Sequence, residues 1–197
     1  MRLGFLASNN GSSMRAIVAA CRDGRLDAQP VLVVSNRRES RALAFANEQG
    51  VASLCIPTIK DPDAADDALT AALRGAGVDL VVLSGYLRKL GPRALAAYRG
   101  RVLNVHPALL PAFGGQGMYG RRVHEAVLAS GVAETGATVH VVDEEYDHGP
   151  PVAQVRVPVL AGDTAQAIEA RVMAAEPGLF LDTLGRIARG ELKLPTP

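Results

Sequence analysis

The run from Val78 to Ser84 (VDLVVLS) is almost continuously apolar and has the length of one β-strand. Runs of this kind are typical of parallel strands that are buried on both faces. A polar loop, GYLRKL, follows it from Gly85 to Leu90, at the end of the strand where ligands bind in open α/β sheets. The run therefore favours an α/β fold with a ligand site near this loop.

Strand-like and helix-like patterns alternate through the first hundred residues. This alternation predicts a Rossmann-like, doubly wound, mostly parallel sheet with helices on both faces. Strands are expected at 3–7, 31–35, 51–56, 78–84 and 102–105, and helices at 14–21, 39–49, 63–73 and 92–98.

The pattern changes after Pro111. Residues Phe113–Gly120 contain four glycines in eight positions, which is too flexible for a regular element. A helix is expected at 121–129, followed by an antiparallel strand pair at 136–142 and 152–158, and a long helix at 164–189 with a kink at Pro177. Because no repeat or linker interrupts the chain, we expect a single domain covering residues 1–197.

Composition excludes several classes of function. With 197 residues, 48% of them hydrophobic, the chain can bury one sizeable core. Lys and Arg (21) balance Asp and Glu (20), so nothing indicates a nucleic-acid partner. No apolar run approaches the ~20 residues that span a bilayer, and we expect a cytoplasmic protein without a membrane partner. The two cysteines, Cys21 and Cys55, lack metal or disulfide spacing and are expected to be reduced core residues.

The segment RVLNVHPALLP, from Arg101 to Pro111, carries the first candidate catalytic residues. Asn104 and His106 stand at i and i+2 of the expected strand, so their side chains share a face. An amide can donate to an oxygen that becomes negative, and an imidazole can move a proton near neutral pH. The pair suits acyl-type chemistry, although a strand end with a satisfied His would explain the same residues.

A candidate anion site follows the first strand. The turn SNNGSS leaves the backbone amides of Gly11, Ser12 and Ser13 at the start of a helix, where unpaired N–H groups and the helix dipole favour an anion. The turn matches neither a dinucleotide-binding nor a P-loop signature. Simple capping by serine remains the alternative.

Five motifs, in this order, resemble the phosphoribosylglycinamide formyltransferases: SNNGSS, VVLSGYLRKL, LNVHPALLP, GATVHVVDEEYDHGP and VPVLAGDTAQAIEARVMAAE. The resemblance implies transfer of a formyl group from 10-formyltetrahydrofolate to the amine of glycinamide ribonucleotide, in purine synthesis and without a metal. It also implies a nucleotide-phosphate-binding half at 1–100 and a catalytic, folate-binding half at 101–197.

By the same resemblance, the catalytic group would be Asn104, His106 and Asp147. Asp147 would pair with His106, raise the pKa of that imidazole and order a water for proton transfer. Taken alone, Asp147 could equally be a residue that caps a turn before Gly149 and Pro150.

The resemblance also assigns the ligand sites. The residues implied for glycinamide ribonucleotide are Gly11, Ser12, Ser13, Pro107 and Glu176. Those implied for the folate are Leu87, Arg88, Leu90, Asn104, Val139, His140, Val142, Asp143, Glu144 and Asp147.

Some positions depart from the pattern of the family. Ala108 replaces the usual Ser of HPSLLP, and Met173 stands where relatives often carry Gln or Lys near the phosphate. The lost phosphate contact would pass to Arg15 or Arg171. We expect His124 to lie on the surface and His148 in a loop.

Three alternatives are less consistent with the chain. Methionyl-tRNA formyltransferase would be expected to continue into a nucleic-acid-binding domain, and formyltetrahydrofolate deformylase to begin with a regulatory one. A non-catalytic nucleotide-binding module would have no need of Asn104, His106 and Asp147 together. The sequence leaves open whether the protein is a monomer or a homodimer.

Overall fold

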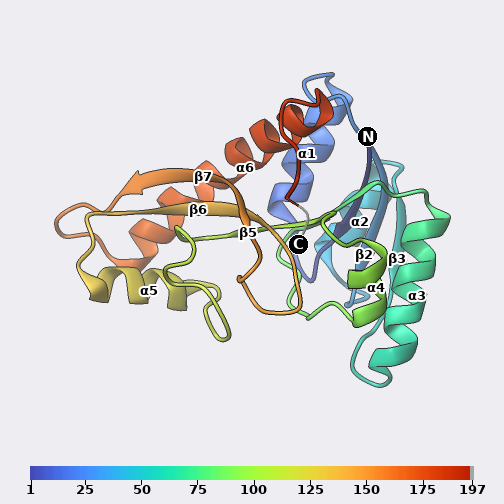
Figure 1. The fold of residues 1–197 in the computed structure, drawn as a ribbon, viewed down its shortest axis with the longest axis horizontal. Coiled ribbons are helices and arrows are strands. Elements are labelled where there is room, and N and C mark those ends of the chain that lie inside the picture. Colours follow the sequence, from blue (N-terminus) through green and yellow to red (C-terminus); the bar gives the residue numbers. More distant parts are fainter. Residues whose placement is uncertain (196–197) are drawn as a thin grey trace.

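A single seven-stranded sheet organises the chain, in the order β3-β2-β1-β4-β5-β6-β7; the computed structural model describes residues 1–195 (Figure 1). Strands β1 to β5 are parallel, whereas β6 runs antiparallel to β5 and β7 antiparallel to β6. The predicted mostly parallel sheet with a C-terminal antiparallel pair is confirmed. The strands are β1 (Arg2–Leu6), β2 (Gln29–Ser35), β3 (Ala52–Cys55), β4 (Leu80–Leu83), β5 (Val102–His106), β6 (Glu134–Val141) and β7 (Pro151–Pro158), and the helices are α1 (Ser12–Arg22), α2 (Arg41–Glu48), α3 (Pro62–Gly75), α4 (Pro92–Ala97), α5 (Arg121–Ser130) and α6 (Ala165–Ala188).

Alternate residues of the parallel strands face two separate apolar cores. On one face, Phe5 and Val82 pack with residues of α1, α2 and α6. On the other, Leu6 and Leu83 pack with residues of α3 and α4. Because successive strand side chains point to opposite faces, a strand between two helix layers must be apolar throughout. This explains the continuous run that ends in β4.

A third, smaller core lies under the antiparallel pair, where α5 and α6 pack together (Figure 1). It joins Val127 of α5 to Ile168 and Val172 of α6, with Ala137 and Val157 contributed by the two strands. Pro177 lies inside α6 without ending it.

The topology places several connections at one edge of the sheet. The order of the strands changes direction between β1 and β4. At such a point the loops after the two strands lead to opposite faces of the sheet, and ligands of open α/β sheets bind in the crevice between these loops. The β1–α1 turn (residues 7–11), the β4–α4 loop (residues 84–91) and the segment after His106 all begin at these ends. The fold therefore brings the motifs predicted to carry function to one region.

Three predictions about individual residues need correction or refinement. His124 is only 2% exposed, so its predicted surface position is wrong; it shares a buried side of α5 with Val123 and Val127. Cys21 and Cys55 are free thiols, as predicted, but half-buried at the margin of the first core. Burial raises the pKa of Cys21 to about 11.

Within residues 1–195, no helix is both long and apolar enough to cross a bilayer.

Candidate active site

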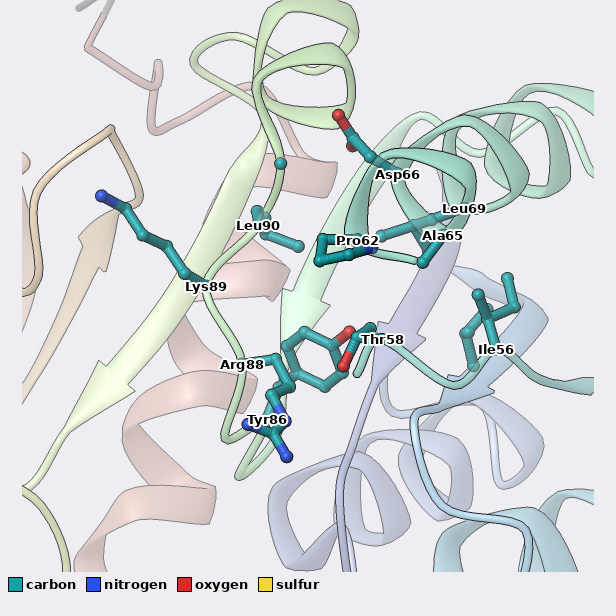
Figure 2. Close-up of a pocket in the computed structure, with 12 residues that line it drawn as sticks. Ile56, Thr58, Pro62, Ala65, Asp66, Leu69, Tyr86, Arg88, Lys89 and Leu90 are labelled. Carbon is teal, nitrogen blue, oxygen red and sulfur yellow. The ribbon is translucent and has the colours of Figure 1, made fainter. Parts of the chain in front are cut away.

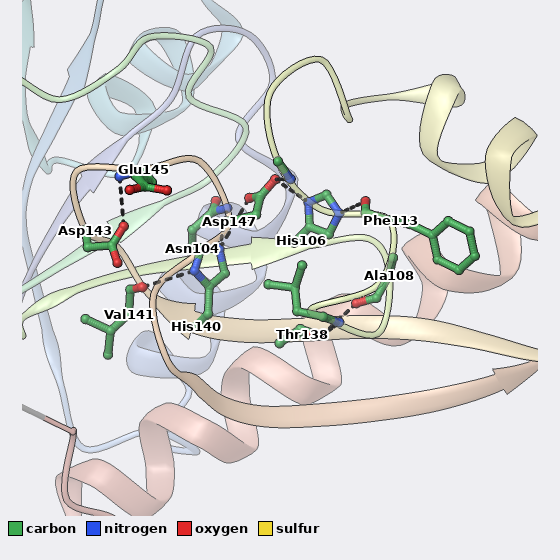
Figure 3. A network of polar contacts seen from close by, with 12 residues as sticks. Asn104, His106, Ala108, Phe113, Thr138, His140, Val141, Asp143, Glu145 and Asp147 are labelled. Atoms are coloured by element: carbon green, nitrogen blue, oxygen red, sulfur yellow. Dashed lines mark hydrogen bonds and ion pairs between the residues drawn. The ribbon is translucent and has the colours of Figure 1, made fainter. Parts of the chain in front are cut away.

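Strand β5 carries Asn104 and His106 in its C-terminal half, two residues apart as in the predicted strand (Figure 3). The chain beyond His106 is fixed by Thr138 of β6. The Thr138 hydroxyl donates to the Ala108 carbonyl at 2.6 Å and accepts from the Leu110 amide at 3.0 Å. His106 thus lies between a paired strand and an anchored turn, so its position is well determined.

His106 is buried, and both of its ring nitrogens face oxygen atoms. Nδ1 lies 3.3 Å from a carboxylate oxygen of Asp147, and Nε2 lies 2.7 Å from the backbone carbonyl of Phe113. The same Asp147 oxygen accepts a hydrogen bond from the Gly115 amide at 3.1 Å. The glycine-rich segment Phe113–Gly120 therefore contacts both members of the predicted His–Asp pair.

Asn104 is held by His140, its cross-strand partner on β6. Their side chains meet at 3.1 Å between Nδ2 and Nε2, and His140 Nδ1 lies 3.1 Å from the Val141 carbonyl. Burial lowers the pKa of His140, which opposes its protonation. A neutral ring that donates from Nδ1 to the carbonyl accepts at Nε2 from the Asn104 amide. His140 therefore orients Asn104.

The loop from 142 to 150 places Asp147 beside both histidines (Figure 3). Asp147 has a left-handed φ of 54°, which costs a non-glycine residue energy and is maintained by the surrounding structure. Gly149 approaches β6 so closely that a Cβ atom would lie 1.9 Å from the Val141 carbonyl oxygen. Asp143 accepts from the Glu145 amide and from His148, and this pairing raises the pKa of His148.

A cleft of about 80 Å³ opens beside Asn104, His140 and Asp147. The β4–α4 loop forms one wall and the 142–150 loop the other. The predicted folate residues that line the cleft are Arg88, Leu90, Asn104, His140, Val142, Asp143 and Asp147.

Three predicted folate residues lie outside this cleft. Val139 is fully buried in the first core, Glu144 is exposed in a neighbouring groove, and Leu87 is 53% exposed.

The residues of the predicted anion site lie at the start of α1. Gly11 has a φ of 65° and begins the helix without a side-chain cap. The Met14 amide donates to the buried hydroxyl of Ser84 at 3.0 Å, so the amides of Ser12 and Ser13 are those left in the first turn for an anion. Ser12 is exposed and Ser13 buried.

Helix α6 carries Glu176, whose pKa burial raises to about 7. On the same helix, Met173 is 51% exposed. Arg171 forms a two-pronged pair with Asp163 at 2.8 and 3.0 Å, so it is not free to replace a phosphate contact at Met173. Arg15 stacks over the Phe45 ring at 4.5 Å.

Some contacts that organise the site were not predicted from the sequence. Ser8 accepts from the Leu87 amide at 2.8 Å and donates to Asn36 at 2.7 Å, which ties the β1–α1 turn to the β4–α4 loop. A serine directly after a strand was the available signal, but its partners lie far away in the chain. No three His, Cys, Asp or Glu residues within 1–195 are grouped so as to hold a metal ion.

Known proteins match the chain over nearly its whole length. The formyl transferase family matches residues 1–184. The phosphoribosylglycinamide formyltransferase of Mycobacterium tuberculosis strain H37Rv is 43% identical over 189 residues, which are 95% of this chain and 85% of that protein. The chloroplastic phosphoribosylglycinamide formyltransferase of Arabidopsis thaliana is 39% identical; the match covers 98% of this chain and 67% of that protein.

A solved structure agrees with these sequence matches. Glycinamide ribonucleotide transformylase 1 from Symbiobacterium toebii superposes with a TM-score of 0.89 at 36% identity, covering 99% of this chain and 91% of that one. By the extent of these matches, the chain belongs to the formyl transferase family and, within it, to the phosphoribosylglycinamide formyltransferases.

Proposed function

We propose that the protein transfers the formyl group of 10-formyltetrahydrofolate to the amine of glycinamide ribonucleotide in purine biosynthesis. The observation that carries the proposal is the connected set of Asn104, His140, Asp147 and His106: the first three line one cleft, and His106 joins them through Asp147. Such a set places an amide donor and an imidazole–carboxylate pair around one reacting carbon. The protein acts in the cytoplasm on these small molecules, as a monomer or homodimer.

Each catalytic residue has a defined task. One N–H of the Asn104 amide is held by His140, so the other can donate to the formyl oxygen as it gains negative charge. His106 supplies a second donor once Nε2 leaves the Phe113 carbonyl. The new bond joins the amine nitrogen to the formyl carbon, and the bond from that carbon to folate N10 breaks. A proton passes from the amine to N10, through a water ordered by Asp147.

In this proposal the cleft holds the pterin ring of the folate. The formyl group is carried on N10 of the same molecule. A pterin presents a row of donors and acceptors, and loop backbone can pair with such a row at the walls of an apolar pocket. Of the predicted folate residues, Arg88, Leu90, His140, Val142 and Asp143 contribute these walls through side chains or backbone.

Nucleotide binding involves α1 and α6. The amides of Gly11, Ser12 and Ser13 bind the phosphate, Glu176 accepts hydrogen bonds from the ribose hydroxyls, and Pro107 borders the substrate next to His106. In this arrangement residues 1–100 hold the phosphate, and residues 101–197 carry catalysis and folate binding.

One assay tests the proposal against its alternatives. Purified protein with 10-formyltetrahydrofolate should release tetrahydrofolate only when glycinamide ribonucleotide is added. Release without the nucleotide would identify a deformylase, and formylation of methionyl-tRNA a tRNA enzyme. Absence of release under every condition would leave only a binding module.

A further inference from the structure

The β4–α4 loop has open space on both of its sides. A second cavity of about 130 Å³ lies between the loop and Pro62, Ala65 and Leu69 of α3 (Figure 2), and neither Asn104 nor His140 lines it. Leu90 at the end of the loop is buried in the second core and the Ser8 hydroxyl holds the Leu87 amide, but the exposed residues Arg88 and Lys89 lie between two hollows. The residues that line both the cleft and the rear cavity are Tyr86, Arg88, Lys89 and Leu90.

A buried carboxylate on α3 holds the end of this loop. The two Asp66 carboxylate oxygens accept hydrogen bonds from the Arg93 amide at 2.8 Å and the Ala94 amide at 3.0 Å. Asp66 is only 4% exposed, and Figure 2 shows its side chain directed toward the chain that follows Leu90. Helix α4 begins after Gly91, which has no side chain to cap it, so the acceptor for the Arg93 amide is a residue 27 positions before Arg93.

Gly91 completes this contact by leaving room for the carboxylate. A Cβ atom on Gly91 would lie 2.2 to 2.6 Å from the carboxyl atoms of Asp66. Its backbone angles, φ −75° and ψ 163°, are ones that alanine adopts readily. Glycine is therefore required here by the approach of Asp66 and not by backbone conformation.

We propose that Asp66 is a positioning residue for the folate: by capping α4 it fixes the β4–α4 loop as a wall of the cleft. This inference rests on the proposed function, because it takes the cleft to be the folate site. Without the carboxylate, two amides lose their acceptor and the loop can relax into the cavity behind it. The carboxylate holds the α4 end of the loop through the Arg93 and Ala94 amides, whereas the β1–α1 turn and α1 are tied to its other end through Leu87 and Ser84, so the affinity for nucleotide should change much less.

The test compares two neighbouring aspartates of α3. Asp66→Ala should raise the KM for 10-formyltetrahydrofolate about tenfold, in the range that loss of a helix cap produces, and leave the KM for glycinamide ribonucleotide within about twofold. Asp66→Asn, which keeps one acceptor oxygen, should fall between Asp66→Ala and wild type. Asp67→Ala is the control, because Asp67 is exposed and pairs with the Arg93 side chain, at 3.0 Å, and not with the backbone amides that Asp66 caps. An equal rise in both KM values would mean a general structural role and would overturn the inference.

A double-mutant cycle tests the contact without relying on Asp66→Ala alone. Gly91→Ala should also raise the folate KM, because the new methyl group displaces the carboxylate. In an Asp66→Ala background the same substitution should cost much less, since no carboxylate remains to collide with. Strictly additive effects would contradict the proposed contact. Wild-type activity in the same assay reports separately on the proposed function.

Discussion

Asn104 and His140 face each other across β5 and β6, and their 3.1 Å hydrogen bond determines which way the Asn104 amide points. Removing His140 leaves the amide free to rotate, so the N–H aimed at the formyl oxygen is no longer held ready. His140→Ala should lower kcat at least about tenfold, and Asn104→Ala by about 10² to 10³. The double variant should be no slower than Asn104→Ala, because both residues act through one donor.

His148→Ala is the matched control, since His148 is exposed and its side chain pairs with Asp143 of the same loop. Its kcat should remain close to that of wild type. If the losses from His140→Ala and Asn104→Ala simply multiply, the two side chains act separately and the orienting role is wrong.

Asp147 should act on turnover far more than on binding. Asp147→Asn retains size but loses the charge that faces His106 at 3.3 Å, and proton transfer is a transition-state effect. We expect kcat to fall by about 10² or more with small changes in both KM values. Glu145→Gln, an exposed change in the same loop, is the control, and near-normal turnover of Asp147→Asn would refute this role.

The alternation of strands and helices and the i, i+2 spacing of Asn104 and His106 are local properties, and the structure has both. The partners of these residues depend on long-range packing. His140 meets Asn104 only because β6 pairs with β5 in this register, a pairing between residues far apart in the chain. The cap that Asp66 places on α4 likewise depends on how two helices meet. His124 was misplaced because a single polar residue in a buried helix face resembles a surface position.

Glu176 should make nucleotide binding depend on pH near neutrality. Burial raises the pKa of Glu176 to about 7. The ionised carboxylate can accept hydrogen bonds from two hydroxyl groups at both oxygens, whereas the protonated form has a donor at one of them. The affinity for glycinamide ribonucleotide should therefore rise as pH increases from about 6 to 8. Calorimetric titration of Glu176→Gln should lack this component; an identical pH profile in both proteins would exclude Glu176 from the site.

The same carboxyl group should make the folded protein less stable as pH rises, whereas it makes nucleotide binding stronger. Its pKa is about 7 in the folded protein against 4.5 for an unperturbed glutamate, so the folded state binds more protons between these values. The free energy of unfolding should then fall as pH rises through this window. Urea unfolding at pH 5 and 7.5 should show a smaller decrease for Glu176→Gln than for wild type.

Gly11 should matter to the nucleotide more than to the folate. A valine there would adopt a left-handed φ of 65°, and its Cβ would lie 3.1 Å from the Met14 side chain. The distortion reaches the amides of the first turn of α1, where we place the phosphate. Gly11→Val should weaken nucleotide binding selectively, and crystals grown in sulfate should show an anion at these amides.

Gly24→Val is a suitable control, because Gly24 also has a positive φ, 76°, but open space around it. It carries the same backbone cost away from the proposed phosphate site. Equal weakening of nucleotide and folate binding by Gly11→Val would indicate a misfolded turn.

The glycine-rich segment Phe113–Gly120 should change its mobility when substrates bind. Its first part is tied to His106 and Asp147 through Phe113 and Gly115, whereas no atom lies within 4 Å of an added Cβ at Gly117 or Gly120. Once His106 serves the substrate, the segment must exchange its contact with the catalytic pair for contacts with ligand. We therefore predict a flap that closes over bound substrates and limits the entry of water.

Limited trypsin digestion can test the flap, because Arg121 and Arg122 begin α5 directly after the segment. Arg121 is exposed and pairs with Glu169 at 3.2 Å, and Arg122 lies over the Tyr119 ring at 5.4 Å. Cleavage there should be fast in the free protein and slow with nucleotide and a folate analogue bound. A variant carrying Arg121→Gln and Arg122→Gln lacks both cleavage sites, so the fragment that is missing from its digest is the one produced by cutting at this position. An unchanged cleavage rate with both ligands present would mean that the segment is a static connection.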